Sequence, residues 1–183
     1  MNKVLVSSLT VILAASLASG AAQSTATERS QERISHEVRN ELVTLPQLSI
    51  FDDLAYKVNG DTVTLTGQVR NPILKDSAGK VVKNIEGVKE VNNNIEVLPP
   101  SRNDDRIRRE VARAIFNDAR LSRYSMGAVQ PIHIIVNRGH VTLVGVVANQ
   151  ADKDAAGLRA NGVPGVFSVQ NDLRVENAAA AEK

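Results

Sequence analysis

The sequence predicts an α+β protein made of two tandem αββαβ units, each a three-stranded mixed sheet covered on one face by two helices. Three observations lead to this prediction: an internal duplication, apolar spacings that switch between helix and strand periods, and an N-terminal segment typical of a cleaved signal peptide. The chain has 183 residues, of which 43% are apolar, and this size leaves room for at most two small domains.

The N-terminal segment, residues 1–22, is predicted to be a signal peptide. A basic start precedes an apolar run over 4–17, and small residues follow, so we expect cleavage near Ala21 or Ala22. The run is short for a membrane span, which needs about 20 residues; an uncleaved N-terminal anchor is the alternative. Residues 23–29 are small and polar and are expected to form a mobile lead-in. The mature chain is expected to be exported, into a bacterial periplasm.

The rest of the chain is one unit written twice. Residues 54–97 align with residues 132–175 at an offset of 78, with identity at 17 of 44 positions. Upstream the offset becomes 73, so the second copy carries five extra residues within 125–131. A repeat of this length suits a small domain used twice. The predicted boundaries are 30–98 for the first domain, 101–176 for the second and 177–183 for a disordered tail.

Each copy begins with a helix and continues into a hairpin. Apolar residues recur at helical spacing from Ile34 in the first copy and from Ile107 in the second. Ser101 stands where a helix cap would stand before the second of these helices. Alternating apolar residues then flank turns at 59–60 and 137–139, whose Asn and Gly residues accept the backbone of a tight hairpin.

A second, weaker helix and a last strand complete each copy. The helix is expected from about residue 75 to 83 and from 151 to 160, and a strand begins after Gly87 and Gly165. Two helices can cover only one face of a three-stranded sheet, so each unit has two layers. The other face must be polar or covered.

Repeated glycines and asparagines indicate structural constraints. Gly67 and Gly145 interrupt inward-facing strand positions, where the missing side chain allows a bulge or the close approach of a helix. Asn93 and Asn171 share parity with the apolar residues of the last strand, so we expect them to face the core. A buried amide needs hydrogen-bond partners. The two amides could belong to a binding site, but we expect them to bond to the main chain.

The repeated motifs resemble a known family. Val-Thr-Leu-x-Gly-x-Val occupies 63–69 and 141–147, and Gly-Val-x-x-Val-x-Asn occupies 87–93 and 165–171. This pattern is similar to the BON domain of bacterial osmotically inducible and nodulation proteins. The resemblance implies a non-enzymatic envelope protein associated with phospholipid surfaces, stress protection or chaperoning of envelope proteins. One two-domain relative type is a lipoprotein that binds anionic phospholipid through the first helix of its second domain; this chain has neither Cys to lipidate nor Trp.

Composition narrows the possible chemistry. With no Cys and a net charge of +2, the chain has no thiolate chemistry and lacks the concentrated basic surface that nucleic acid needs. Ser77 and Lys80 fit Ser-x-x-Lys, but the second copy has Ala155 and Leu158 there, so a chance match is the better interpretation. The three histidines lack metal-ligand spacing. We therefore expect no enzyme activity, no metal and no cofactor.

Charge differs between the copies and indicates a binding surface. Residues 30–98 hold 8 basic and 10 acidic side chains, whereas residues 101–176 hold 11 basic and 8 acidic. Arginines at helical spacing next to exposed aromatic residues suit phosphate headgroups, with the apolar groups entering the lipid boundary. Local ion pairs on a solvated helix face are the alternative. The predicted lipid-binding or partner-binding residues are Arg106, Arg109, Arg113, Phe116, Arg120 and Tyr124.

The outward face of the second sheet is the other candidate surface. Ile135, Val144 and Val146 are predicted to lie on it, where the first copy has polar residues. We expect the first copy or a second molecule to cover these residues, since exposed apolar patches usually mark contacts. The sequence thus predicts a peripheral envelope-stress protein that binds anionic phospholipid or envelope client proteins. A structural adaptor that docks on an envelope assembly through this apolar face is the alternative.

Overall fold

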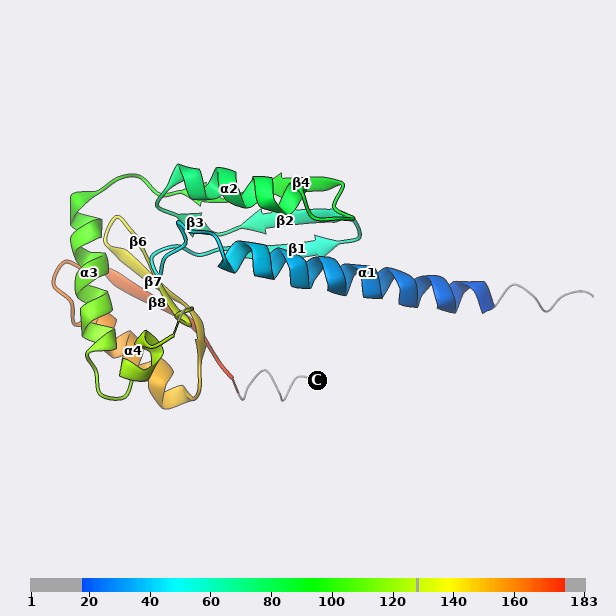
Figure 1. The fold of residues 1–183 in the computed structure, drawn as a ribbon. Helices are drawn as coiled ribbons and strands as arrows, with labels where there is room; N and C mark the ends of the chain where they lie inside the picture. The colour runs from blue at the N-terminus through cyan, green and yellow to red at the C-terminus, as the bar shows by residue number, and fades with distance from the viewer. Residues whose placement is uncertain (1–17, 128, 177–183) are drawn as a thin grey trace, which may run out of the picture.

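The computed structural model describes residues 18–127 and 129–176 (Figure 1). Most of the predicted signal peptide and the predicted tail at 177–183 lie outside the described residues. The first helix, α1, runs from Ala18 to Val43. Residues 23–29, expected as a lead-in, are therefore helical; they include Gln, Ala, Glu and Arg, which favour helix, and neither Gly nor Pro.

The first domain has the predicted mixed sheet. Its strands run in the order β1-β2-β4, with β1 antiparallel and β4 parallel to β2. Beyond Gly67 a short parallel pair, β3 and β5, continues these strands. The elements after α1 are β1 (Ala55–Asn59), β2 (Thr62–Thr66), β3 (Gln68–Val69), α2 (Pro72–Lys83), β4 (Glu90–Asn93) and β5 (Glu96–Val97).

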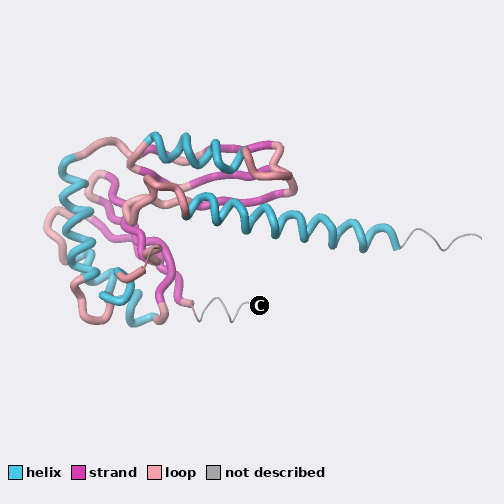
Figure 2. Tube along the Cα trace, viewed as in Figure 1, coloured by secondary structure: helices cyan, strands magenta, loops and turns pink. Residues whose placement is uncertain are grey.

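The second domain repeats this plan with continuous strands. Its sheet order is β6-β7-β8, again with one antiparallel and one parallel pairing. Figure 2 shows helices, in cyan, beside the magenta strands of each domain. Each domain has its own apolar core, so the predicted α+β duplication is confirmed. The elements are α3 (Arg102–Phe116), the 3₁₀ turn η1 (Ser122–Ser125), β6 (Ile132–Asn137), β7 (His140–Val147), α4 (Gln150–Asn161) and β8 (Ser168–Val175).

A side-chain cap explains where α3 begins. Ser101 Oγ accepts a hydrogen bond from the backbone N–H of Asp104 at 3.2 Å, as its spacing predicts. The Asp104 carboxylate is buried and accepts from the N–H groups of Arg138 and Gly139. It therefore ties the start of α3 to the turn between β6 and β7.

Gly67 and Gly145 occupy strand positions that leave no room for a side chain. Their φ angles are +115° and +130°, and an added Cβ would overlap the carbonyl oxygens of Asp53 and Pro131. The next residue in each strand, Gln68 or Val146, donates its N–H to that same carbonyl at 3.0 Å. Neither predicted role is correct: the strand register continues through both glycines without an extra residue, and the close neighbour is the backbone that precedes the hairpin, and not a helix.

Asn93 and Asn171 hold the last strand to the second helix of each domain. Their amide groups donate to the carbonyls of Lys75 and Lys153 at 2.8 and 2.7 Å. A Cβ at Gly79 would lie 2.8 Å from the amide nitrogen of Asn93, and the second domain repeats this contact. The main chain is thus the partner of both amides, as predicted, and the repeated glycine leaves room for it.

The first domain contacts the edge strand of the second through residues 50–53, here called the interdomain segment. Ile134 N–H donates to the carbonyl of Ile50 at 2.7 Å, and His133 Nδ1 donates to the carbonyl of Asp52 at 2.6 Å. Phe51 packs against the core of the second domain. This contact pairs part of the free edge of β6.

Arg70 extends the contact between the domains. Its guanidinium lies 5.3 Å from the ring centre of Phe51 and 3.8 Å from the Asp105 carboxylate. Burial raises the pKa of Asp53 in the same segment, and the nearby His133 partly offsets this. The two domains are therefore joined by packing and hydrogen bonds as well as by the Pro99–Pro100 link.

Candidate functional site

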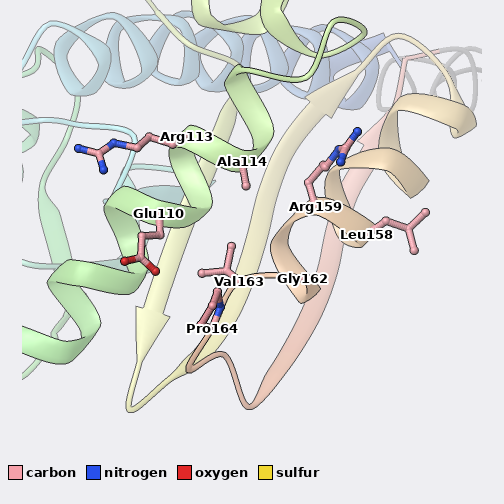
Figure 3. Close-up of a pocket in the computed structure, with 8 residues that line it drawn as sticks. All are labelled: Glu110, Arg113, Ala114, Leu158, Arg159, Gly162, Val163 and Pro164. Carbon is pink, nitrogen blue, oxygen red and sulfur yellow. The ribbon is translucent and has the colours of Figure 1, made fainter.

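The second domain has a groove between α3 and α4. Its volume is about 550 Å³. Figure 3 shows Ala114, Val163 and Pro164 between the two helices, with Arg113 on α3 and Arg159 on α4. We call this site the basic groove, and it is lined by Glu110, Arg113, Ala114, Leu158, Arg159, Gly162, Val163 and Pro164.

Arginines surround the basic groove. Arg109 and Arg113 are exposed on α3 and make no ion pair within the described residues. Arg120 lines an adjoining hollow together with Arg159. Arg159 pairs with Asp118 at 2.7 Å, and Asp118 has a lowered pKa because it accepts hydrogen bonds from the Arg120 N–H and from Arg159. The free charge of this surface is therefore positive.

An apolar side chain stands beside these cations. Leu158 lines both the basic groove and the adjoining hollow, and 74% of its surface is exposed. The same helix α4 thus presents an exposed leucine next to the Arg159 guanidinium. A surface of this kind offers charge to an anionic group and apolar area to whatever lies beside it.

Arg106, predicted as a binding residue, has a structural role. It pairs with Glu110 at 2.8 Å and donates to the carbonyl of Pro164 at 3.3 Å. The first domain repeats this arrangement with Arg33, Glu37 and the carbonyl that precedes Gly87. Gly87 and Gly165 have positive φ, and an added Cβ would crowd these arginines. Repetition in both domains indicates a shared fold constraint.

The prediction that Phe116 and Tyr124 are exposed was wrong. Phe116 is half-buried against the second core, and Tyr124 is only 8% exposed. The Tyr124 hydroxyl donates to Asp152 at 2.6 Å and accepts from the Ala148 N–H at 2.9 Å. Satisfied hydroxyl bonding allows the tyrosine ring to enter the core, so Tyr124 is not available as an anchor, and Phe116 keeps only part of its surface exposed.

Asp152 is the centre of a polar network that the sequence analysis missed. It is 2% exposed and accepts hydrogen bonds from Tyr124, Arg123 and Asn149. Burial alone would raise the pKa of Asp152, but the bonds from Tyr124 and Arg123 outweigh burial and hold this pKa below its ordinary value. The network fastens the loop before β6 to the start of α4.

Substitution of Asp152 by Asn tests this network. Asp152→Asn is expected to lower the unfolding free energy by about 2 kcal/mol near neutral pH, because Tyr124 and Arg123 lose a charged acceptor. A carboxylate with a lowered pKa stabilises the fold above its unfolded pKa of about 4, and this contribution is lost as the pH falls through the folded pKa. Urea unfolding should therefore show the difference between the two proteins shrinking below about pH 4.

The control for that substitution is Asp154→Asn. Asp154 lies on the same helix and is exposed, with only a hydrogen bond from Gln150 at 2.7 Å. Its unfolding free energy should stay within about 0.5 kcal/mol of the wild type. Equal stability of the two variants at every pH would contradict the role given to Asp152.

The apolar sheet face of the second domain is partly covered. Ile135 points away from the core and yet is only 2% exposed, whereas Val144 and Val146 are half-buried. His133, on the same side of β6 as Ile135, bonds to the Asp52 carbonyl of the first domain. The first domain thus reaches β6 through the Asp52 carbonyl, and cover of the whole face by the first copy or a second molecule stays a prediction.

The residues considered for catalysis do not come together. Ser77 and Lys80 lie on α2 of the first domain, and His36 lies on α1, bonded to Asn40. His140 bonds to Ser168 Oγ at 2.7 Å on the surface. Within residues 18–127 and 129–176, no group of three or more His, Cys, Asp or Glu side chains could hold a metal ion.

Two residues of the basic groove were missed in the sequence. Leu158 and Arg159 lie on the second helix of the copy, whereas the sequence analysis followed arginines on the first. The repeat alignment contains the signal: at the offset of 78 these residues replace Lys80 and Val81. A comparison of the unequal positions of the repeat, in addition to the equal ones, would have found both.

The described part of the chain contains no helix that is long and apolar enough to cross a membrane.

The chain is similar to a curated protein, Osmotically-inducible protein Y of Escherichia coli (strain K12). It is 30% identical over 132 residues, which is 68% of this chain and 62% of that protein. The match thus spans less than two thirds of the relative's length.

Two solved structures of CdsD also match. CdsD is a structural protein of the type III secretion system of Chlamydia trachomatis. The match to its C-terminal domain has 12% sequence identity and a TM-score of 0.31, and it covers 76% of this chain and 96% of the CdsD chain. A second structure also shares 12% identity, covers 82% and 97%, and has a TM-score of 0.28. Scores this low carry no argument about function.

The family assignment rests on both halves of the chain. The profile of the BON domain matches residues 30–99 and residues 103–177. Each matched region contains one αββαβ unit with its own core. The chain therefore belongs to the BON domain family and carries two BON domains in tandem.

Proposed function

We propose that this protein is an exported, non-enzymatic envelope-stress protein that binds anionic phospholipid surfaces through the basic groove of its second domain. The observation that supports this most is a pair of exposed arginines on α3, Arg109 and Arg113, that make no ion pair within the described residues; Arg113 lines the groove together with the exposed Leu158. Membership of the BON family and the likeness to an osmotically inducible protein support the stress role.

The chemistry of the groove suits a phosphate headgroup. A guanidinium donates two parallel hydrogen bonds to phosphate oxygens, and these charge-assisted bonds are stronger than neutral ones. Each basic residue near an anionic membrane contributes about 1 kcal/mol. Leu158 would add apolar contact at the boundary of the acyl chains. Such binding is peripheral and reversible, and it needs no catalytic group.

Vesicle flotation tests this proposal. Arg109→Ala combined with Arg113→Ala should weaken binding to vesicles that contain phosphatidylglycerol about thirtyfold, because two attractive charges are lost. The matched control is a double variant with Arg174→Ala and Arg138→Ala, since both arginines are exposed outside α3 and α4. Equal flotation of the two double variants would refute the basic groove as the lipid site. Absence of wild-type binding would refute the lipid function itself and leave acidic client proteins as the occupant.

The alternative is an adaptor that uses the apolar face of the second sheet. Only Val144 and Val146 of the three predicted residues keep exposed area for such a contact, because Ile135 is buried. The two functions differ in their response to salt. Headgroup attraction weakens as ionic strength rises, whereas an apolar contact does not.

A further inference from the structure

The first domain has a groove in the same place as the basic groove. It lies between α1 and α2 and has a volume of about 360 Å³. The repeat offsets of 73 and 78 pair Glu37 with Glu110 and Ile85 with Val163, so the two grooves are built from equivalent positions. We call this site the acidic groove, and it is lined by Glu37, Asn40, Glu41, Val81, Asn84, Ile85 and Glu86.

The two grooves carry opposite charge. Glu41 and Glu86 of the acidic groove stand where the basic groove has Ala114 and Pro164. Neither glutamate makes an ion pair within the described residues, and both are exposed. No lysine or arginine lines this groove. The free charge is therefore negative here and positive at the corresponding place in the second domain.

At the positions equivalent to those of the acidic groove, the basic groove has fewer acidic and more basic side chains. Arg113 replaces Asn40, and Arg159 replaces Val81. Leu158, which is 74% exposed, replaces Lys80. The acidic groove offers the apolar side chains of Val81 and Ile85 between its glutamates. Charge and apolar area on one groove thus have counterparts on the other.

We propose that the acidic groove of one molecule docks on the basic groove of a second copy of this chain. Glu41 and Glu86 would face Arg113 and Arg159 across the contact, with Leu158 over the apolar floor. Charge complementarity of this kind selects the partner and speeds encounter. It also disfavours contacts between two acidic or two basic grooves, so only unlike domains associate.

The contact uses different surfaces on the two molecules. Each chain carries one acidic and one basic groove, so every molecule can use both grooves to contact neighbouring molecules. Contacts of this type close into a ring or dimer when the geometry returns to the start, and otherwise they extend into a chain. Because the attraction is largely electrostatic, association should be strongest at low ionic strength.

A charge-exchange experiment in the absence of lipid tests the proposal. Sedimentation velocity of the full mature chain at low salt should show concentration-dependent association of the wild type. Arg113→Glu makes both grooves acidic, and Glu41→Arg cancels the remaining charge of Glu86 in the first groove, so each variant alone should associate about tenfold more weakly. A mixture of the two variants should associate again, because the unchanged acidic groove of one variant then meets the unchanged basic groove of the other.

Controls separate this contact from general charge effects. Arg174→Glu makes the same change on β8 in the sheet of the second domain and should associate like the wild type. A monomeric wild type at low salt, or a mixture that associates no better than its components, would overturn the proposal. Lipid binding is measured separately with vesicles, so failure of self-association leaves that function standing, and the reverse is also true.

Discussion

Gly145→Ala is expected to destabilise the second domain by about 3 kcal/mol or more, the largest effect of any single substitution considered. Gly145 has a φ of +130°, which side chains rarely adopt, and an added Cβ would overlap the carbonyl oxygen of Pro131. That carbonyl also accepts the N–H of Val146 at 3.0 Å, so it cannot move without loss of a strand contact. Thermal or urea unfolding measures the change.

Gly162→Ala is the matched control in the same domain. Gly162 has a φ of −77°, and its added Cβ would find neighbours at 3.6 and 3.7 Å, which is ordinary contact. Its unfolding free energy should differ from that of the wild type by no more than about 0.5 kcal/mol. A Gly145→Ala protein that unfolds together with this control would contradict the steric constraint at Gly145.

Phe51→Ala is expected to uncouple the two domains. Phe51 is half-buried, belongs to the first domain by sequence and packs against the core of the second. Its removal should cost about 2 kcal/mol, less than a fully buried phenylalanine, and the Arg70 guanidinium would lose the ring it lies over. In calorimetry, the unfolding temperatures of the two domains should lie further apart in this variant than in the wild type. Proteolysis near Pro99–Pro100 should also become faster.

The control for Phe51 is another phenylalanine. Phe167 is 76% exposed, and its ring centre lies 5.9 Å from that of His140. Phe167→Ala should leave the separation of the transitions unchanged and shift stability by no more than about 0.5 kcal/mol. Identical calorimetric traces for the two variants would show that the interdomain segment does not couple the domains.

Most of the fold could be predicted because the chain contains the same unit twice. Gly67 with Gly145, and Asn93 with Asn171, occupy equal positions in both copies, which separates structural constraints from chance. Repetition also accounts for the contacts of Arg106, because its ion pair with Glu110 has a counterpart in the pair of Arg33 and Glu37. A residue type that both copies share indicates the fold, and residues that differ are the better guide to binding.

Features that depend on contacts between residues distant in the sequence could not be predicted from it. Tyr124 looked exposed because it follows the helix, yet its hydroxyl reaches Asp152, 28 residues further on. The helix start of Ala18 was missed because residues 23–29 have no apolar periodicity, although their propensity favours helix. The contact of the first domain with β6 was also beyond the sequence, because the bond between His133 and Asp52 joins residues that are 81 positions apart.

The proposed binding of anionic lipid surfaces by the basic groove of the second domain should depend on both salt and lipid charge. The most direct measurement is the partition of the full mature chain onto phosphatidylglycerol vesicles as salt is raised, with neutral phosphatidylcholine vesicles in parallel. We predict strong binding to the anionic vesicles at low salt, a steep loss as the Debye length falls to about 8 Å at physiological ionic strength, and weak binding to neutral vesicles throughout. Equal binding to both vesicle types, or binding that salt leaves unchanged, would contradict it.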